Sequence, residues 1–530
     1  MTRQKVIVTE RIAEEGLDLL RQDLEVDFRD GIPREELLEI IHEYDALIVR
    51  SVTKVNEELI SKATKLKVVG RAGNGIDNID VDACTRNGVI VANTPDSNTI
   101  SAAEQTISLL LASVRNTAYA NDFLKGGTWD RKPFRGMELY GKTVGVIGLG
   151  RIGSMVATRL KAFNMQVIAY DPYISEERFE RYGSKKIDSL EELVKQSDVI
   201  TVHTPRNEET MHMLDEKMFA IAKDGVRVVN CARGGIIKEA ALLEGLKSGK
   251  IKSAGLDVFE KEPAIDNPLF AFNNVVVTPH LGADTFEAQK RVGENIAEQV
   301  IKALKGDIVP NVVNLPTMLS EELNYLKPYI NLAEKMGSVY HQIEKSSVSR
   351  IELNYGGPIT MNETEMLTVA FLKGLLEQVM WSKVSYVNAK LIADDRGIKI
   401  FENKEPQSNK RYKNVITARI VSQDKSFEIV GTLSRARNPL LVEINGFETE
   451  TDLQGYVIMV ENHDRPRVIG PFATFLGDEG VNIASMKVAR KTKGDTAIML
   501  VNVDHEVSEE VLDKLSEVDG IISKPLLLHF

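Results

Sequence analysis

The chain contains very few cysteines, and this scarcity limits its chemistry. Only two occur in 530 residues, Cys84 and Cys231. Two isolated thiols cannot build a disulfide framework or a cysteine-rich metal site. We therefore expect both to be ordinary buried thiols, and we predict no metal site.

Long hydrophobic runs are also missing. No stretch reaches the roughly 18 apolar residues that a membrane-spanning helix needs. Residues 1–10 lead directly into a strand-like run, without the apolar core of a signal peptide. We therefore expect no membrane association and a cytoplasmic location.

Excess positive charge is absent too. Asp and Glu number 77 against 66 Lys and Arg, which gives a net charge of −11, and the basic residues are scattered. This balance argues against nucleic acid as a partner. A hydrophobic content of 43% with 27% charged residues is typical of a globular protein. Because 530 residues are too many for one hydrophobic core, three or four domains are expected.

The most informative segment lies in the middle of the chain. Residues 143–171 read as an apolar strand, a glycine-rich turn, an amphipathic stretch and a second strand closed by Asp171. Gly148 permits a tight turn, Gly150 lets a pyrophosphate approach the backbone, and Gly153 lets the helix pack on its strand. The helix would direct unpaired N–H groups at the phosphates. Asp171 would bind the ribose hydroxyls and repel a 2′-phosphate, so NAD is the predicted cofactor.

Strand-like runs alternate with amphipathic helices on both sides of this segment, which predicts parallel sheets wound with helices. A long helix over residues 99–124, capped by Ser101 and Glu104, is expected to join two domains. Residues 309–314 look like a strand that returns to the first domain. The first domain is therefore predicted to be discontinuous.

The pattern changes after Pro316. Residues 318–450 mix β-rich runs with helix-like segments at 321–344 and 362–381, and they carry no nucleotide or metal signature. Residues 454–530 read strand, helix, strand, strand, helix, strand. This βαββαβ order is typical of a ferredoxin-like unit.

Three residues at expected strand-to-loop exits could carry chemistry: Arg233, Glu262 and His280. Oxidation of a secondary alcohol needs a base of near-neutral pKa, a carboxylate that orients it, and a cation for the substrate's carboxylate. These residues meet those needs. Position alone also allows a surface ion pair for Arg233 and an ordinary acid for Glu262, and His203 at a similar strand end competes with His280.

Five motifs follow one another along the chain: Arg71-Ala-Gly-Asn-Gly, Gly148-Leu-Gly-Arg-Ile-Gly, Asn230-Cys-Ala-Arg-Gly-Gly, Ala254-Gly-Leu-Asp-Val-Phe-Glu and Thr278-Pro-His-Leu-Gly. Together they resemble the signatures of the D-isomer-specific 2-hydroxyacid dehydrogenases. The resemblance covers residues 4–316. It implies that Arg233, Glu262 and His280 are the catalytic residues, with His280 removing the hydroxyl proton.

The resemblance also implies a set of cofactor-binding residues in addition to the glycines and Asp171. Arg151 and Ile152 would contact the pyrophosphate. Thr204, Cys231 and Asp257 would surround the rest of the NAD molecule.

Substrate residues are implied in the same way. Asn74 matches a substrate-binding position, and Arg50, Arg71 and Arg131 are candidate cations for a phosphate group on the substrate. Arg131 resembles a residue that reaches into a neighbouring subunit's site. This implies a homo-oligomer, either a dimer or a tetramer.

Roughly the last 210 residues resemble the intervening and ACT domains of the long form of this family. The resemblance implies NAD-dependent oxidation of D-3-phosphoglycerate to 3-phosphohydroxypyruvate, which is the first step of phosphorylated L-serine biosynthesis. The expected architecture is a Rossmann-type doubly wound sheet inserted in a flavodoxin-like domain, followed by an α+β domain and the ferredoxin-like ACT domain. The predicted bounds are 1–98 with 285–317 for substrate binding, 99–284 for NAD binding, 318–452 for the intervening domain and 453–530 for the ACT domain.

The ACT segment departs from its family at one position. Ligand-binding members carry Asp-Arg-Pro-Gly where this chain has Asp464-Arg-Pro-Arg467. Asp464 and Asn482 match positions that bind serine in some relatives, but Arg467 places a long side chain where an effector needs close access to the backbone. L-serine feedback and a purely oligomerising role are therefore alternatives.

Two other functions are compatible with parts of the sequence. One is a different D-2-hydroxyacid dehydrogenase, such as a glyoxylate or hydroxypyruvate reductase, although those relatives usually stop near residue 320. The other is a non-catalytic NAD sensor of the corepressor type. The presence of Arg233, Glu262 and His280 weakens the second alternative.

Overall fold

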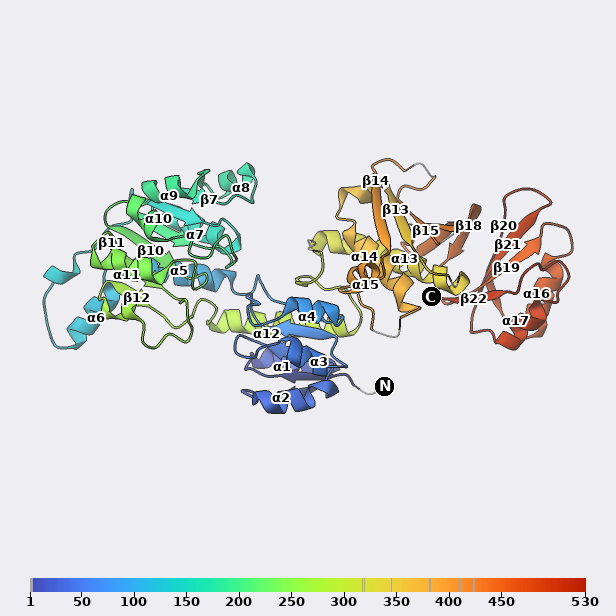
Figure 1. Cartoon of the computed structure of the whole chain (residues 1–530), viewed down its shortest axis with the longest axis horizontal. Coiled ribbons are helices and arrows are strands. Elements are labelled where there is room, and N and C mark those ends of the chain that lie inside the picture. Colours follow the sequence, from blue (N-terminus) through green and yellow to red (C-terminus); the bar gives the residue numbers. More distant parts are fainter. Residues whose placement is uncertain are drawn as a thin grey trace.

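The computed structural model describes residues 3–316, 318, 320–344, 346–380, 383–408, 411–422 and 425–530. In this part of the chain the strands form four sheets, which follow one another from the N-terminal to the C-terminal region (Figure 1). Thr317, at the end of the predicted substrate-binding domain, and Trp381, at the end of a predicted helix-like segment, lie outside the described residues.

The first sheet has five parallel strands in the order β2-β1-β3-β4-β5, as in flavodoxin-like folds. All four residues of β3 are buried, as expected for a strand covered by helices on both faces. The elements are β1 (Lys5–Val8), α1 (Glu14–Asp23), β2 (Glu25–Phe28), α2 (Arg34–Ile40), η1 (Ile41–Glu43), β3 (Ala46–Val49), α3 (Glu57–Lys62), β4 (Val68–Arg71), α4 (Val81–Arg86) and β5 (Ile90–Ala92).

The chain returns to this first sheet much later in the sequence. Helix α12 (Phe286–Leu304) packs on α1 and β4. The predicted return strand is only a single antiparallel bridge between Val312 and Ala92. Pro310 lacks an N–H group, and Asn311 has a φ of +61°, so a regular strand cannot form here.

The second sheet has seven parallel strands in the Rossmann order β12-β11-β10-β9-β6-β7-β8. The strand order reverses between β6 and β9, and ligands bind at the carboxyl ends of the strands at such a point. The elements are α5 (Thr99–Val114), α6 (Thr117–Lys125), η2 (Lys132–Phe134), β6 (Thr143–Ile147), α7 (Arg151–Ala162), β7 (Gln166–Tyr170), α8 (Glu176–Arg181), β8 (Lys185–Lys186), α9 (Leu190–Gln196), β9 (Val199–Val202), α10 (Glu216–Ile221), β10 (Val226–Asn230), α11 (Glu239–Lys247), β11 (Ile251–Leu256), η3 (Pro268–Ala271) and β12 (Val275–Val277).

The prediction of one long helix over residues 99–124 is wrong. The segment forms α5 and α6, which are separated because Asn116 adopts a left-handed conformation with a φ of +55°. The predicted capping pair is wrong as well. Asn98 occupies the position before α5, whereas Ser101 is buried within the helix.

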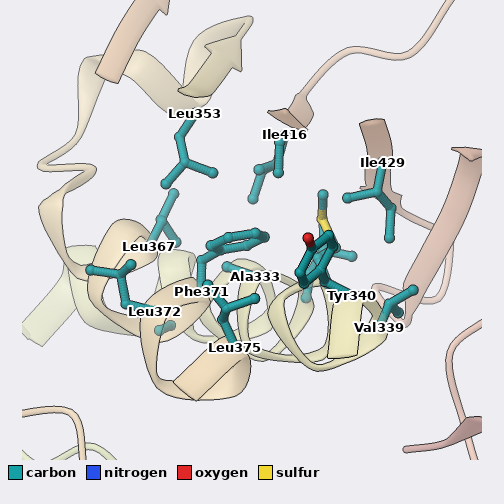
Figure 2. Close-up of a cluster of buried hydrophobic side chains, with 14 of the residues drawn as sticks. Ala333, Val339, Tyr340, Leu353, Leu367, Phe371, Leu372, Leu375, Ile416 and Ile429 are labelled. Carbon is teal, nitrogen blue, oxygen red and sulfur yellow. The ribbon is translucent and has the colours of Figure 1, made fainter. Parts of the chain in front are cut away.

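The third domain packs two helices against a six-stranded sheet of order β14-β13-β15-β16-β17-β18. Figure 2 shows Phe371 and Leu375 pointing from the helical layer toward Leu353 and Ile416 on the strands. The elements are α13 (Ser320–Ile343), β13 (Arg350–Gly356), η4 (Pro358–Met361), α14 (Glu365–Glu377), α15 (Ala389–Asp395), β14 (Lys399–Glu405), β15 (Val415–Val421), β16 (Ser426–Leu433), β17 (Pro439–Ile444) and β18 (Phe447–Asp452).

The last domain confirms the predicted βαββαβ order, and its four strands form an antiparallel sheet of order β20-β21-β19-β22. Its final strand is short, Leu526–His529, and Ile521 before it makes only an isolated bridge with Asn462. The elements are β19 (Tyr456–His463), α16 (Ile469–Asp478), β20 (Ile483–Arg490), β21 (Thr496–Val503), α17 (Glu509–Leu515) and β22 (Leu526–His529). Across the described residues, no helix combines the length and apolarity needed to cross a bilayer.

Candidate active site

A cavity of about 490 Å³ lies between the first two domains. The loop after β4 contributes Asn74 and Asp77 to its lining. The Rossmann domain contributes Arg151 at the start of α7, Arg233 after β10 and His280 after β12. Residues from opposite sides of the predicted domain boundary thus face one shared space.

The glycine-rich turn after β6 has the shape that a dinucleotide needs. Gly148 has a φ of +86°, and a Cβ on Gly153 would lie 2.0 Å from the carbonyl oxygen of Gly148. A Cβ on Gly150 would meet no described atom within 4 Å. The first and third glycines are therefore required for the turn and for helix packing, and the second faces open space at the start of α7.

The N-terminus of α7 and Asp171 complete a fit for NAD. No side chain of the described residues caps α7, so its first N–H groups are available to a pyrophosphate. The Asp171 carboxylate accepts hydrogen bonds from the backbone N–H groups of Leu149 (2.9 Å) and Tyr173 (3.1 Å). These contacts fix the carboxylate beside the turn, and its oxygens retain lone pairs for ribose hydroxyls.

His280 and Glu262 form a hydrogen-bonded pair at the cavity. Nδ1 of His280 lies 2.8 Å from Oε2 of Glu262. Burial acts to raise the pKa of the Glu262 carboxyl, but hydrogen bonds from His280 and the Phe259 N–H outweigh it and hold that pKa below its usual value. Glu262 is therefore a carboxylate, so Nδ1 carries the proton and Nε2 is free to accept another.

The loop that carries His280 is anchored by Asp257, which is completely buried. Its carboxylate accepts hydrogen bonds of 2.8 Å from the N–H groups of Leu281 and Gly282, and a further one from the Thr278 hydroxyl. Both carboxylate oxygens are thus used to hold the loop. The family resemblance implies a cofactor contact for Asp257, which stays a prediction; its role in anchoring the loop was not predicted from the sequence.

Arg233 lies among other guanidinium groups. Burial, together with the positive charges of Arg233 and Arg50, lowers the pKa of Arg71 to about 10. The Nε of Arg71 is buried and has no hydrogen-bond partner in the described part of the chain. Three guanidinium groups gathered in this way favour the binding of an anion. Asp77, which sequence reasoning missed, pairs with Arg233 through a distance of 3.4 Å from Oδ2 to Nε.

The competing histidine, His203, is held differently. Burial lowers its pKa to about 3, and its Nε2 shares a 2.9 Å hydrogen bond with the Thr201 hydroxyl. It is therefore neutral and already engaged. The predicted cofactor residues Ile152, Thr204 and Cys231 line the cavity.

Other predicted residues lie outside the cavity lining. Arg131 is exposed on the segment before η2. Asp464 accepts hydrogen bonds from the Gly494 N–H and from Arg490, and Asn482 donates one to Asp504. Arg467 is exposed and has a φ of +68°. Their predicted roles concern a second subunit or an effector.

Three protein families match successive parts of the chain. Residues 107–282 match the D-isomer specific 2-hydroxyacid dehydrogenase, NAD binding domain. Residues 325–445 match the D-3-phosphoglycerate dehydrogenase intervening domain, and residues 456–520 match the ACT domain.

Similar proteins cover nearly the whole chain. The D-3-phosphoglycerate dehydrogenase of Methanocaldococcus jannaschii is 47% identical over 517 residues, which are 98% of either chain. That of Bacillus subtilis is 41% identical over 525 residues, 99% of each.

Among solved structures, a glyoxylate reductase from Paecilomyes thermophila matches with a TM-score of 0.55 and 31% identity, over 59% of this chain and 99% of its own. A D-lactate dehydrogenase from Aquifex aeolicus, complexed with NAD and lactic acid, matches with a TM-score of 0.51 and 32% identity, over 57% of this chain and 96% of its own. These shorter relatives lack counterparts for a large part of the chain.

Proposed function

The chain belongs to the D-3-phosphoglycerate dehydrogenase family, and from this membership we propose that it oxidises D-3-phosphoglycerate to 3-phosphohydroxypyruvate with NAD. This reaction is the first step of phosphorylated L-serine biosynthesis. One structural observation supports it most strongly: the hydrogen-bonded His280 and the cation Arg233 face the same cavity as the start of α7.

The proposed chemistry begins with a proton transfer. Nε2 of His280 takes the proton of the substrate's C2 hydroxyl, and the Nδ1 proton stays on the ring, hydrogen-bonded to Glu262. The negative charge of Glu262 stabilises the imidazolium that forms. Bound NAD supplies the acceptor for the hydride that leaves C2. Arg233 holds the substrate's carboxylate and polarises the developing carbonyl oxygen.

The remaining site residues have proposed binding roles. Gly148, Gly150, Gly153, Arg151 and Ile152 would hold the pyrophosphate. Asp171 would hold the ribose, and Thr204, Cys231 and Asp257 would surround the rest of NAD. Asn74 would contact the substrate, and Arg50 and Arg71 would neutralise its phosphate; the lack of a partner for the buried Nε of Arg71 in the described region supports this.

A homo-oligomer, dimer or tetramer, is part of the proposal, with Arg131 entering the cleft of a second copy. Several large apolar side chains near Arg131 are exposed, among them Trp129 at 81% and Leu124 at 53%. Such a cluster is suited to a subunit interface. Light scattering after size-exclusion chromatography tests it, and a monomer would contradict it.

The proposed division of labour follows the predicted bounds: substrate binding by 1–98 with 285–317, NAD binding by 99–284, and regulation by 318–452 and 453–530. The ACT domain would bind a small-molecule effector, with L-serine as the candidate and Asp464 and Asn482 as its contacts. The competing proposal for this domain is oligomerisation alone. A cytoplasmic location fits the metabolic role of the relatives.

The decisive experiment is a steady-state assay with NADH and 3-phosphohydroxypyruvate, run with and without L-serine. Hydroxypyruvate and glyoxylate serve as competing substrates. A kcat/KM for the phosphorylated substrate no better than for hydroxypyruvate would contradict the proposal and favour a reductase of the shorter type. Serine that leaves the rate unchanged would favour the oligomerising role of the ACT domain.

A further inference from the structure

Asp77 is the acidic residue of the cleft that contacts the substrate-binding cation. It lies in the loop after β4, across the cleft from the Rossmann domain. Its Oδ2 is 3.4 Å from Nε of Arg233, and its Oδ1 is 3.8 Å from Nη2 of Arg206, which follows β9. One carboxylate of the first domain thus faces two guanidinium groups of the second.

The backbone beside Asp77 is shaped to let Arg233 lie against it. A Cβ on Gly75 would be 2.2 Å from Nη2 of Arg233 and 2.9 Å from Oδ2 of Asp77. Any side chain at Gly75 would therefore displace the guanidinium group or the carboxylate. On its other side, Nη1 of Arg233 donates a 2.7 Å hydrogen bond to the Ala232 carbonyl.

These contacts fix the plane of the Arg233 guanidinium group. Asp77 forms an ion pair at Nε, and the Ala232 carbonyl accepts a hydrogen bond from one N–H of Nη1. The other N–H groups of Nη1 and Nη2 can therefore bind an anion. Asp77 also offsets the mutual repulsion of Arg233 and Arg71, since its charge favours protonated Arg71. Without it, Arg233 would be free to rotate away from its cationic neighbours.

We propose that Asp77 is a positioning residue that orients Arg233 for the substrate's carboxylate. The inference rests on the proposed function, because it takes Arg233 as the residue that binds this carboxylate. Removing the charge of Asp77 weakens substrate binding and leaves the hydride-transfer chemistry at His280 in place. KM is the constant that changes most, because Arg233 contacts the carboxylate in both the ground and transition states; kcat also falls, by no more than about twofold, because Arg233 polarises the developing carbonyl oxygen as well.

The primary test compares Asp77→Asn with Asp18→Asn in the full-length enzyme. Asp18 also pairs with an arginine, Arg21 at 2.9 Å, but on the exposed face of α1. We expect Asp77→Asn to raise the KM for 3-phosphohydroxypyruvate about 10-fold, with kcat within about twofold, because a partly exposed ion pair contributes modestly. Asp18→Asn should leave both constants unchanged. An unchanged KM in Asp77→Asn would overturn the proposal.

Two further arms identify the group through which Asp77 acts. Arg233 binds the carboxylate, which hydroxypyruvate shares, so KM for both substrates should rise by the same factor. A rise confined to the phosphorylated substrate would mean that Asp77 acts on the cations that bind the phosphate.

In an Arg233→Lys background, Asp77→Asn should raise KM by less than a further twofold or so, about the limit expected when the two residues act as a unit. Arg206→Gln should raise KM less than Asp77→Asn does; an equal rise would mean that the pair across the cleft carries the effect.

A binding measurement separates this inference from the proposed function. Isothermal titration calorimetry with 3-phosphohydroxypyruvate, without NADH, measures affinity in the absence of turnover. Failure of the wild-type protein to turn over the substrate contradicts the proposed function. An affinity that is equal in wild-type protein and Asp77→Asn contradicts the role of Asp77.

Discussion

Two histidine–glutamate pairs in the Rossmann domain look alike but differ in surroundings. His280 is 2.8 Å from Glu262, and His212 is 3.3 Å from Glu260. Both histidines have a left-handed backbone, with φ of +58° and +55°. Their side chains are also similarly exposed, at 48% and 42%. A paired histidine on an unusual turn is therefore not enough to define a catalytic residue.

The difference lies in what surrounds each pair. His280 lines the cavity that it shares with Arg233 and the start of α7, and its loop is anchored by the buried Asp257. His212 is outside that cavity lining, and its partner Glu260 accepts a hydrogen bond from the N–H of Glu239 at the start of α11. The proposed catalytic pair therefore differs from the other pair in its shared cavity and its anchored loop.

The largest expected effect comes from removing the imidazole ring of each histidine. His280→Ala should lower kcat by about 10³-fold, because general acid–base catalysis contributes about 10² to 10⁴. His212→Ala is the matched control and should keep kcat within about twofold. Steady-state kinetics with NADH measure both. Equal losses in the two variants would refute the distinction between the pairs.

Removing the glutamate charge should have the next largest effect. The amide of Glu262→Gln can still accept a hydrogen bond from the ring of His280, but it carries no charge to stabilise the imidazolium. We therefore expect kcat to fall about 10²-fold. Glu260→Gln should change it little.

The same variant has a pH signature in stability. The pKa of Glu262 is lower in the folded protein than its usual value. Its stabilising contribution is therefore complete above that usual value of about 4.3 and is lost as pH falls through the folded value. The Tm difference between wild type and Glu262→Gln should shrink below about pH 4. A difference that grows there would contradict the assignment of Glu262 as a carboxylate.

Much of this arrangement was predictable from the chain, and the reasons differ by feature. The glycine turn at Gly148 has strict steric demands, so its sequence reveals its shape. The anchoring by Asp257 and the orientation of Arg233 by Asp77 depend on contacts between distant loops, which no local pattern encodes. The break at Asn116 was missed because the apolar pattern continues across it, and one residue's φ decides the outcome.

A smaller loss should follow from loosening the His280 loop without touching the pair. Asp257→Asn replaces a carboxylate that accepts from Leu281, Gly282 and Thr278 with a group that has one acceptor oxygen. We expect kcat to fall about 10-fold and stability to fall by about 1 to 3 kcal/mol, since a buried donor loses its partner. Denaturant unfolding and kinetics measure the two effects. Unchanged kcat with lowered stability would mean that the anchor is purely structural.

The smallest expected effect concerns another left-handed residue, Arg467, whose φ of +68° resembles those of the two histidines. Arg467 is exposed, whereas the loop of His280 is anchored by the completely buried Asp257. Arg467→Gly removes about 1 kcal/mol of backbone strain but adds a similar amount of freedom to the unfolded chain. Tm should therefore stay within about 2 °C of wild type.

The informative readout for Arg467→Gly is serine inhibition. Glycine opens the backbone beside Asp464 to a small zwitterion, so the variant should need less L-serine for half-inhibition than wild type, with kcat unchanged. Arg465→Gly is the matched control, because Arg465 instead pairs with Asp519 at 2.6 Å. If Arg467→Gly leaves the serine response as it is in wild type, then the side chain at this position does not control effector access. The left-handed turn at Arg467 would then differ in function from the turn at His280, whose loop is held by Asp257.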